Sequence, residues 1–292
     1  MEQCRLYSWE LVTKSLVWAY RGPVNPRLRK TYGLLGYPGL WYLHHGDVAL
    51  SWEGGEMQAG RGSWVLVPPS PFDQHFSDDT EISSVRFILN GLSNSCLFAL
   101  EGPVVLRQVD QVMVRSCAEL TRNCGKYYKG RNPLALRMNQ ADICAHTGIE
   151  IAFLTFLREL LRITDLNGIR LQQFDLQDPR LSRCVSYIKN NRLDRSFTEA
   201  QLAKVAGVSV GHLNRLFQNT FGQTSRAWYE DYRFNESVRL LESSCLIKEA
   251  AYALGFSSPQ HFANWFRNFT GKSPSEWRKQ HAWMSYSAGT ES

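Results

Sequence analysis

The sequence lacks three features that would place the protein in a membrane, in a secretory route or in a disulfide-stabilised class. No stretch approaches the roughly 18 consecutive apolar residues of a membrane-spanning helix. The first ten residues contain no basic segment followed by an apolar one, so we expect no cleaved secretory signal. Seven cysteines occur without a C-x-x-C pair, which is typical of buried thiols in a reducing compartment. We therefore expect a cytoplasmic protein without membrane contact.

An excess of charge of one sign is also missing from the front of the chain. Residues 1–179 carry 18 Lys and Arg against 18 Asp and Glu, whereas residues 180–292 carry 15 against 9. The net charge of +6 therefore belongs to the back of the chain. A basic segment favours contact with a polyanion, although a moderately basic surface can also serve only to keep a domain in solution.

The front of the chain does contain a strand-like alternation of apolar and polar residues. Val48, Leu50 and Trp52 alternate with smaller residues before the turn at Gly54-Gly55, and similar runs continue to about Asn90. Period-2 runs separated by Gly and Pro at about eight to twelve residues are typical of an antiparallel barrel or sandwich. A weaker run over 15–20 predicts an edge strand.

After Gly102 the apolar spacing changes to the threes and fours of amphipathic helices. One helix is predicted around residues 109–120. A second is predicted to begin at Asn132-Pro133, because Pro suits a first helical turn, and Thr147-Gly148 could divide it. The pair either caps the barrel or joins two subunits, since both uses bury the same apolar stripe. We predict a homodimer through residues 106–162.

Residues 202–217 follow the spacing of a helix-turn-helix. Ala203 is small enough for a second helix to cross closely, and Gly207, four residues on, permits the left-handed backbone of a sharp turn. Ser209 can cap the next helix, whose inner face begins at Leu213. One such match is weak evidence, but the spacing indicates a helix-turn-helix.

The same spacing returns 48 residues later. Ala251 and Gly255 are again four residues apart, Ser257-Ser258 can cap, and Phe262 faces inward. Between the copies, residues 225–242 predict one helix of about 27 Å at 1.5 Å per residue. Such a helix can hold two recognition helices about one DNA turn, roughly 34 Å, apart. Two copies in the basic part of the chain predict binding to DNA.

These residues resemble the DNA-binding domain of the AraC/XylS family of transcription regulators over residues 180–280. Ser225, Trp228 and Ser237 stand where the family pattern has Pro, Tyr and Ala, at packing or helix-start positions. The family's closing signature appears here as Gly255-Phe256, Phe262, Phe266-Arg267, Gly271-Lys272-Ser273-Pro274 and Trp277-Arg278.

The resemblance implies that outward side chains near the start of each recognition helix meet base edges. Arg can bond guanine through two N–H groups, and Asn or Gln can bond adenine. Gly211 has no side chain, so we expect the first copy to read one position fewer. We expect specificity from Arg215 and Asn264, and phosphate contacts from Arg267 and Lys272. The expected DNA-contacting residues are Ser209, Gly211, Asn214, Arg215, Gln218, Pro259, Gln260, His261, Asn264, Arg267 and Lys272.

For the front of the chain the resemblance implies an effector-binding, dimerising domain, commonly a cupin-like barrel. Gly62, Pro68 and His75 follow part of the second cupin motif, but the adjacent pair His44-His45 replaces the His-x-His of the first. Adjacent residues of a strand point to opposite faces, and a metal needs three or four converging ligands. We therefore expect no metal and no cofactor.

Five of the nine tryptophans lie in the first 64 residues. Trp side chains with a His and an Arg can stack on a sugar ring and bond its hydroxyls, although the same aromatic residues also suit a core. The candidate effector-binding residues are Tyr32, Trp41, His75 and Arg86, and a carbohydrate is one candidate effector.

The sequence thus predicts a mixed fold with an antiparallel, cupin-like barrel in front and an all-α tandem helix-turn-helix behind. The expected function is regulation of transcription at promoter DNA under the control of a small-molecule effector, with RNA polymerase as a further partner and without enzymatic activity. A barrel enzyme, or a non-sensing binding module, that carries a DNA-binding tail is the open alternative. The expected divisions are 1–164 for the sensor and dimerisation domain, 165–179 for a linker, 180–281 for the DNA-binding domain and 282–292 for a tail.

Overall fold

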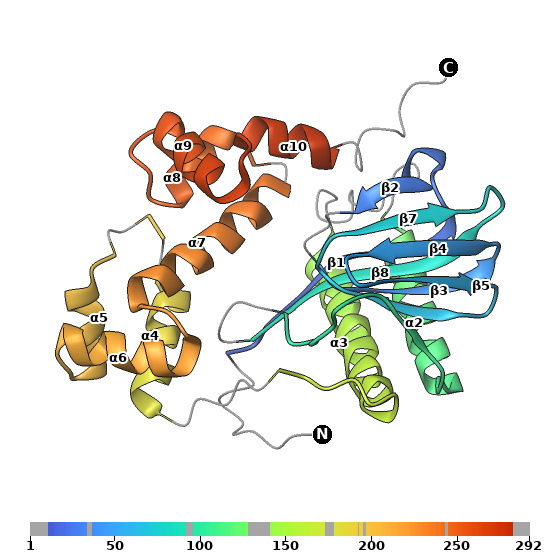
Figure 1. Ribbon diagram of the computed structural model, residues 1–292, viewed down its shortest axis with the longest axis horizontal. Helices are drawn as coiled ribbons and strands as arrows, with labels where there is room; N and C mark the ends of the chain where they lie inside the picture. The colour runs from blue at the N-terminus through green and yellow to red at the C-terminus, as the bar shows by residue number, and fades with distance from the viewer. Residues whose placement is uncertain are drawn as a thin grey trace.

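The protein consists of a region of β-sheets packed against two helices and a second region made only of helices (Figure 1). No helix in the described part of the chain is long and apolar enough to cross a membrane. The computed structural model describes residues 11–33, 37–91, 96–127, 141–172, 178–191, 193–194, 197–242 and 245–282.

Two antiparallel sheets form the front region, as the alternation of apolar residues predicts. The run over 15–20 is part of an edge strand, as expected. The five-stranded sheet has the order β1 (Thr13–Pro23), β8 (Glu81–Asn90), β3 (Gly39–His45), β6 (Trp64–Val67) and β9 (Val104–Leu106). The four-stranded sheet has the order β2 (Lys30–Gly33), β7 (Phe72–Phe76), β4 (Asp47–Trp52) and β5 (Gly55–Gly60).

The two sheets do not close into the expected barrel. Among the described strands, none of one sheet pairs with a strand of the other. The chain crosses between the sheets at abrupt corners, such as Gly46 between β3 and β4, where φ is +70°. Between β6 and β7 stand Pro68, Pro69 and Pro71, whose missing N–H groups prevent the ladder from continuing. The strands therefore form two layers with a core between them.

Strand β8 separates two cores because both of its faces are buried. Val85, Phe87 and Leu89 lie in the core that continues under the helices. Ile82, on the other face, lies in the core between the two sheets together with Trp41 and other residues of both layers. Side chains of a strand alternate between its faces, so Ser84, Arg86 and Ile88 share the face of Ile82, where Ile88 packs against Val17 and Trp18 in a smaller cluster.

Helices α2 (Gln111–Gly125) and α3 (Ile143–Leu166) cover the five-stranded sheet (Figure 1). The ring of Phe156 on α3 lies 6.2 Å from that of Phe87 on β8. Helix α3 continues through Thr147-Gly148, so the alternative of a divided helix is wrong. The helix start expected at Asn132-Pro133 lies outside the described residues.

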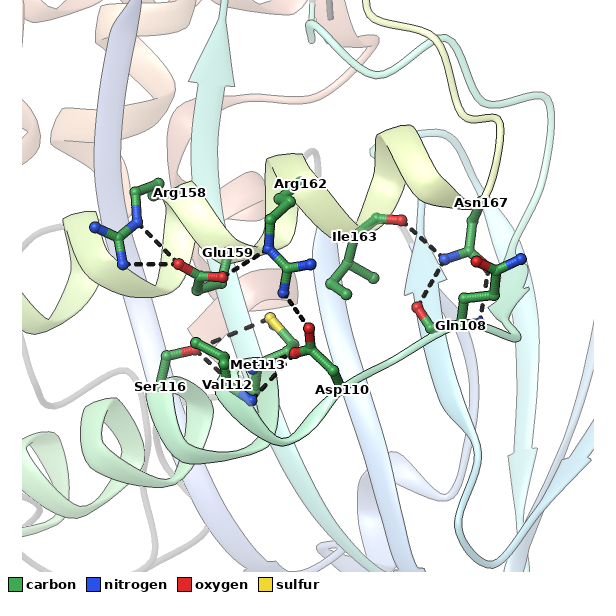
Figure 2. A network of polar contacts seen from close by, with 10 residues as sticks. All are labelled: Gln108, Asp110, Val112, Met113, Ser116, Arg158, Glu159, Arg162, Ile163 and Asn167. Atoms are coloured by element: carbon green, nitrogen blue, oxygen red, sulfur yellow. Dashed lines mark hydrogen bonds and ion pairs between the residues drawn. The ribbon is translucent and has the colours of Figure 1, made fainter.

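A polar network joins the start of α2 to the middle of α3 (Figure 2). The Asp110 carboxylate accepts hydrogen bonds from the backbone N–H groups of Val112 and Met113, and so caps α2. The same carboxylate pairs with Arg162 of α3, which also pairs with the buried Glu159. These bonds lower the pKa of both carboxyl groups. The ion pair between Asp110 and Arg162 thereby links the start of α2 to α3 and helps to fix the angle between the two helices.

The back region contains seven described helices. Two separate aromatic cores hold it together, one around Phe217 and Trp228 and one around Phe262 and Phe266. The helices are α4 (Pro179–Asn190), α5 (Glu199–Ala206), α6 (Val210–Phe221), α7 (Ser225–Glu242), α8 (Ile247–Ala253), α9 (Pro259–Thr270) and α10 (Pro274–Ala282).

Candidate nucleic-acid interface and sheet interior

The first helix-turn-helix consists of α5, a short turn and α6. Gly207 ends α5 with φ of +71°, the left-handed conformation that glycine adopts at low cost. The hydroxyl of Ser209 accepts a hydrogen bond from the N–H of His212 at 3.3 Å and caps α6. Ala203 is 4% exposed at the crossing, and Leu213 and Phe217 are fully buried. The predicted spacing therefore forms the predicted motif.

The second helix-turn-helix consists of α8 and α9 and is built in the same way. Ala251 is fully buried and Gly255 has φ of +77°. The Ser258 hydroxyl accepts from the N–H of His261 at 3.2 Å and caps α9. Phe262 is buried against the core of the second unit. The repeat read from the sequence is thus a structural repeat.

Helix α7 joins the two units and is anchored at both ends by aromatic and charged contacts. Near its start, Trp228 is fully buried and its ring lies 6.2 Å from that of Phe217 of α6. Further along, Glu230 accepts a hydrogen bond from the indole N–H of Trp265 of α9 at 2.9 Å. At its end, the Arg278 guanidinium donates to the backbone oxygen of Leu241 at 3.0 Å. The helix therefore holds α6 and α9 as parts of one framework.

Most of the expected DNA-contacting side chains point away from these cores. Pro259 is half-buried in the first turn of α9. The amide of Gln260 donates to Asn264 at 3.2 Å, and Gln218 donates to the backbone oxygen of Gly222 at 2.7 Å. The exposed residues of the expected set are Ser209, Gly211, Arg215, Gln218, Gln260, His261, Asn264, Arg267 and Lys272.

Asn214 does not have the outward orientation expected of a base-reading side chain. Its Nδ2 donates to Glu199 Oε1 at 2.8 Å, and its Oδ1 accepts from the backbone N–H of Ser225 at 3.0 Å. The Ser225 hydroxyl lies 3.0 Å from Glu199 Oε1 and 2.8 Å from Asn214 Oδ1. The three residues form a polar clamp that joins the starts of α5 and α7 to the middle of α6.

Sequence reasoning missed this clamp because its members lie 15 and 26 residues from Glu199. No local period connects them, and each alone is an ordinary residue for its position. A signal was nevertheless present: Asn is a poor residue for a helix interior because it competes for backbone hydrogen bonds. An Asn one position after the buried Leu213 therefore indicates a polar partner within the fold as much as it indicates contact with a base.

In the sheet region the structure brings together two of the four candidate effector residues. The Arg86 guanidinium carbon lies 5.3 Å from the ring centre of Trp41. His75 is exposed on β7, on the face opposite Phe72 and Phe76, so it does not approach this pair. The backbone of Tyr32, in β2, pairs with that of Asp73 in β7. The side chain of Tyr32 lies outside the described part of the structure.

Arg86 has an environment that is unusual for a charged residue. It is 0% exposed, and burial alone lowers its pKa to about 9. The ring of Trp18 on β1 lies 6.0 Å from the guanidinium carbon on another side. Among the described residues, no cluster of three or more His, Cys, Asp or Glu could hold a metal ion. The chemistry available between the sheets is therefore that of a cation and aromatic faces.

The geometry of the back region defines a class of protein module, the tandem helix-turn-helix, and comparison with known families identifies its type. A family model described as "Helix-turn-helix domain" matches residues 202–280. Taken together with the regulators that match the same part of the chain, this segment is a helix-turn-helix domain of the AraC type. The resemblance inferred from the sequence is confirmed for this part of the chain.

Among curated proteins, the chain is similar to the HTH-type transcriptional regulator GlxA of Rhizobium meliloti (strain 1021). The two are 34% identical over 114 residues, which are 39% of this chain and 35% of GlxA. It is also 29% identical over 129 residues to the arabinose operon regulatory protein of Escherichia coli (strain K12), covering 41% of this chain and 44% of that protein. The chain thus spans less than half the length of these relatives.

Among solved structures, the chain is similar to an AraC-type transcriptional regulator from Chromobacterium violaceum. The identity is 33% and the TM-score 0.33, over 36% of this chain and 93% of that one. It is also similar to ToxT from Vibrio cholerae O395, with 13% identity and a TM-score of 0.46, over 95% of this chain and 99% of that one.

Proposed function

We propose that the protein is a sequence-specific DNA-binding transcription regulator. The observation that carries the proposal is the pair of equivalent recognition helices, α6 and α9, at the two ends of α7. Each begins at a capping serine, buries an aromatic face and exposes a polar one. At 1.5 Å per residue the 18 residues of α7 span about 27 Å, which suits two successive major-groove segments roughly 34 Å apart. The named relatives are themselves described as regulators.

Within this function we propose that Arg215 and Asn264 read bases, while Arg267 and Lys272 contact phosphates. All four are exposed on or just after the recognition helices. We propose a different role for Asn214, whose amide is already bonded on both sides by the clamp. It positions α6 so that Arg215, the next residue, projects into the groove.

We further propose that the front region senses a small-molecule effector and performs no catalysis. Support comes from the two-layer arrangement, which places Trp41 in the core between the sheets with the buried Arg86 5.3 Å from its ring. The proposed limits are 1–164 for this sensor, 165–179 for the linker and 180–281 for the DNA-binding domain. Such a regulator would act in the cytoplasm beside DNA and RNA polymerase.

We also propose that α3 forms a homodimer interface. Its face away from the sheet carries exposed Ile143, Ile151 and Leu154, which are 75%, 62% and 47% exposed. These residues repeat at intervals of eight and three along one side of the helix, in line with Thr147 and Arg158. An apolar stripe at helical spacing on an otherwise well-packed helix is typical of an association surface.

Selection of bound sequences from random DNA with the full chain tests the DNA-binding proposal. The expected product is a site with two short conserved blocks about one helical turn apart, because two linked helices read one face of the duplex. Inserting half a turn between the blocks should reduce affinity toward that of one block. Lys126→Ala, which removes one positive charge from the end of α2, is the control and should leave affinity unchanged. Equal binding to selected and random DNA at every salt concentration would refute the proposal.

A further inference from the structure

Arg86 is a buried cation without a buried counter-charge. Its side chain is 0% exposed, and among the described residues only the backbone oxygen of Tyr37 accepts from it, at 2.8 Å from Nη1. No acidic group contributes to its pKa, which burial alone lowers. Buried charges in proteins are otherwise paired or bonded on every side, because an unpaired one costs several kcal/mol or more.

The unused atoms of Arg86 lie on one edge of its guanidinium group. Nε and Nη2 are buried and have no hydrogen-bond partner in the described structure. In a guanidinium group these two nitrogens direct parallel N–H bonds outward on the same side, at a spacing that fits the two oxygens of one carboxylate. The bond from Nη1 to the Tyr37 backbone oxygen fixes the orientation of the guanidinium group, and its Nε lies close to the backbone of Gly39.

Flat aromatic surfaces flank the same group. The Trp41 and Trp18 ring centres lie 5.3 and 6.0 Å from the guanidinium carbon, and both rings are buried. The indole N–H of Trp18 donates to Ser84 at 3.2 Å, which fixes the ring. Gly39 leaves room for the arginine stem, because a Cβ there would lie 2.4 Å from Arg86 Cδ.

We infer that Arg86 is the receptor for the carboxylate of a small, flat organic acid whose body lies against Trp18 and Trp41. The inference rests on the proposed sensing function and names the chemical class of its effector. The acid supplies the missing negative charge, and its two oxygens accept from Nε and Nη2. Its apolar body meets the aromatic faces that already surround the guanidinium.

A carboxylate fits this site better than the sugar considered from the sequence. Sugar hydroxyls can accept hydrogen bonds, but they bring no charge to offset a desolvated cation. His75, the other polar residue expected at a sugar site, points out of the opposite face of its sheet. A charge-assisted bidentate bond is about twice as strong as a neutral one, so the charge of the ligand is the property to test.

The experiment compares sodium benzoate with benzamide, its neutral counterpart of nearly equal shape, on the full chain. Tryptophan fluorescence and thermal unfolding are recorded after long equilibration, because Arg86 is enclosed, with sodium chloride matching the ionic strength. Benzoate should change the fluorescence and raise the unfolding temperature, and benzamide should bind at least tenfold more weakly. Cinnamate and octanoate are run beside benzoate to find the preferred body, and arabinose tests the sugar alternative.

Substitutions at the site locate the effect. Arg86→Met keeps the length of the stem and should weaken benzoate binding by about tenfold to a hundredfold, the effect of a lost charged hydrogen bond. Without ligand this variant should unfold at the same or a higher temperature than the parent protein, because an unpaired buried charge is removed. His75→Ala, exposed on the far face, is the control and should bind benzoate normally. If Arg86→Met does not fold, the comparison of benzoate with benzamide on the unchanged chain decides.

The outcomes separate this inference from the proposed function. Equal binding of benzoate and benzamide, preferential binding of arabinose, or no binding of any of the three acids at about 10 mM, well above a 1 mM Kd, would overturn the inference. None of these results affects the DNA selection, which tests the proposed function independently. Binding of benzoate by a chain that selects no DNA sequence would refute the regulator and leave the acid site standing.

Discussion

Three glycines of the helix-turn-helix units should respond in three different ways to the same substitution by alanine. Gly255 has φ of +77°, and a Cβ there would lie 2.4 Å from the backbone oxygen of Leu193. Gly207 has φ of +71°, with nothing within 4 Å of the added carbon. Gly211 lies inside α6, and its added carbon also meets nothing within 4 Å. The series therefore separates backbone strain, steric conflict and helix propensity.

The magnitudes follow from these environments. At Gly211, alanine should stabilise the fold by roughly 0.5–1 kcal/mol, the difference in helix propensity. At Gly207, alanine should cost about 1–2 kcal/mol, because a residue with a Cβ is strained in the left-handed region. At Gly255 the same strain applies, and displacing a backbone carbonyl adds roughly 1–3 kcal/mol. The expected total there is about 2–5 kcal/mol.

Urea unfolding of the full chain, followed by the helical circular dichroism signal, measures the three variants on the same transition. From the highest urea midpoint to the lowest, the expected order is Gly211→Ala, the unchanged protein, Gly207→Ala and Gly255→Ala. Gly255→Ala should also lose sequence-specific binding first, because its turn sets the angle between α8 and α9. Equal costs at Gly207 and Gly255 would contradict the close approach of Leu193 and with it the packing of this turn.

Three further predictions concern the DNA contacts, the dimer and the response to pH. Arg215→Ala should cost about 1–3 kcal/mol of binding free energy on the selected site and relax the base preference at one position. Arg267→Ala should instead weaken binding to all DNA alike and reduce the slope of log affinity against log salt by about one. Equal losses on selected and random DNA for Arg215→Ala would make Arg215 a phosphate contact. The double substitution Ile151→Lys with Leu154→Lys should convert a dimer to a monomer in ultracentrifugation with little change in unfolding temperature. An unchanged molecular mass would exclude the exposed face of α3 as the dimer interface. Burial lowers the pKa of Lys189 from 10.5 to about 8, so the unfolded chain binds more protons between these values and stability should rise from pH 8 to 10.5. Buried thiols oppose this rise, so the quantity to measure is the difference in the free energy of unfolding between the unchanged protein and Lys189→Met, which lacks the contribution of the lysine. Parallel profiles of stability against pH for the two proteins would refute the prediction.

Local sequence patterns determined the elements and the recognition motif of this protein. Ala203, Gly207 and Ser209 each act within a few residues of their own position, as a crossing, a turn and a cap, so their spacing is sufficient to predict the helix-turn-helix. The alternation through Val48 and Leu50 likewise predicts strands, because the period of a strand is a property of the backbone. Antiparallel pairing follows from short connections.

Only the tertiary structure decided how these elements close and what the polar residues between them bind. Two sheets form in place of a closed barrel, since corners at Gly46 and the proline-rich turn after β6 direct successive strands into different layers. Asn214 bonds Glu199 and Ser225 and does not point to the expected DNA face. Arg86 lies near two tryptophan rings and has no acidic partner among the described residues. Hydrogen bonds and buried charges depend on groups that are distant in the chain but adjacent in space. No period or spacing encodes that adjacency, because it arises when the layers and helices pack.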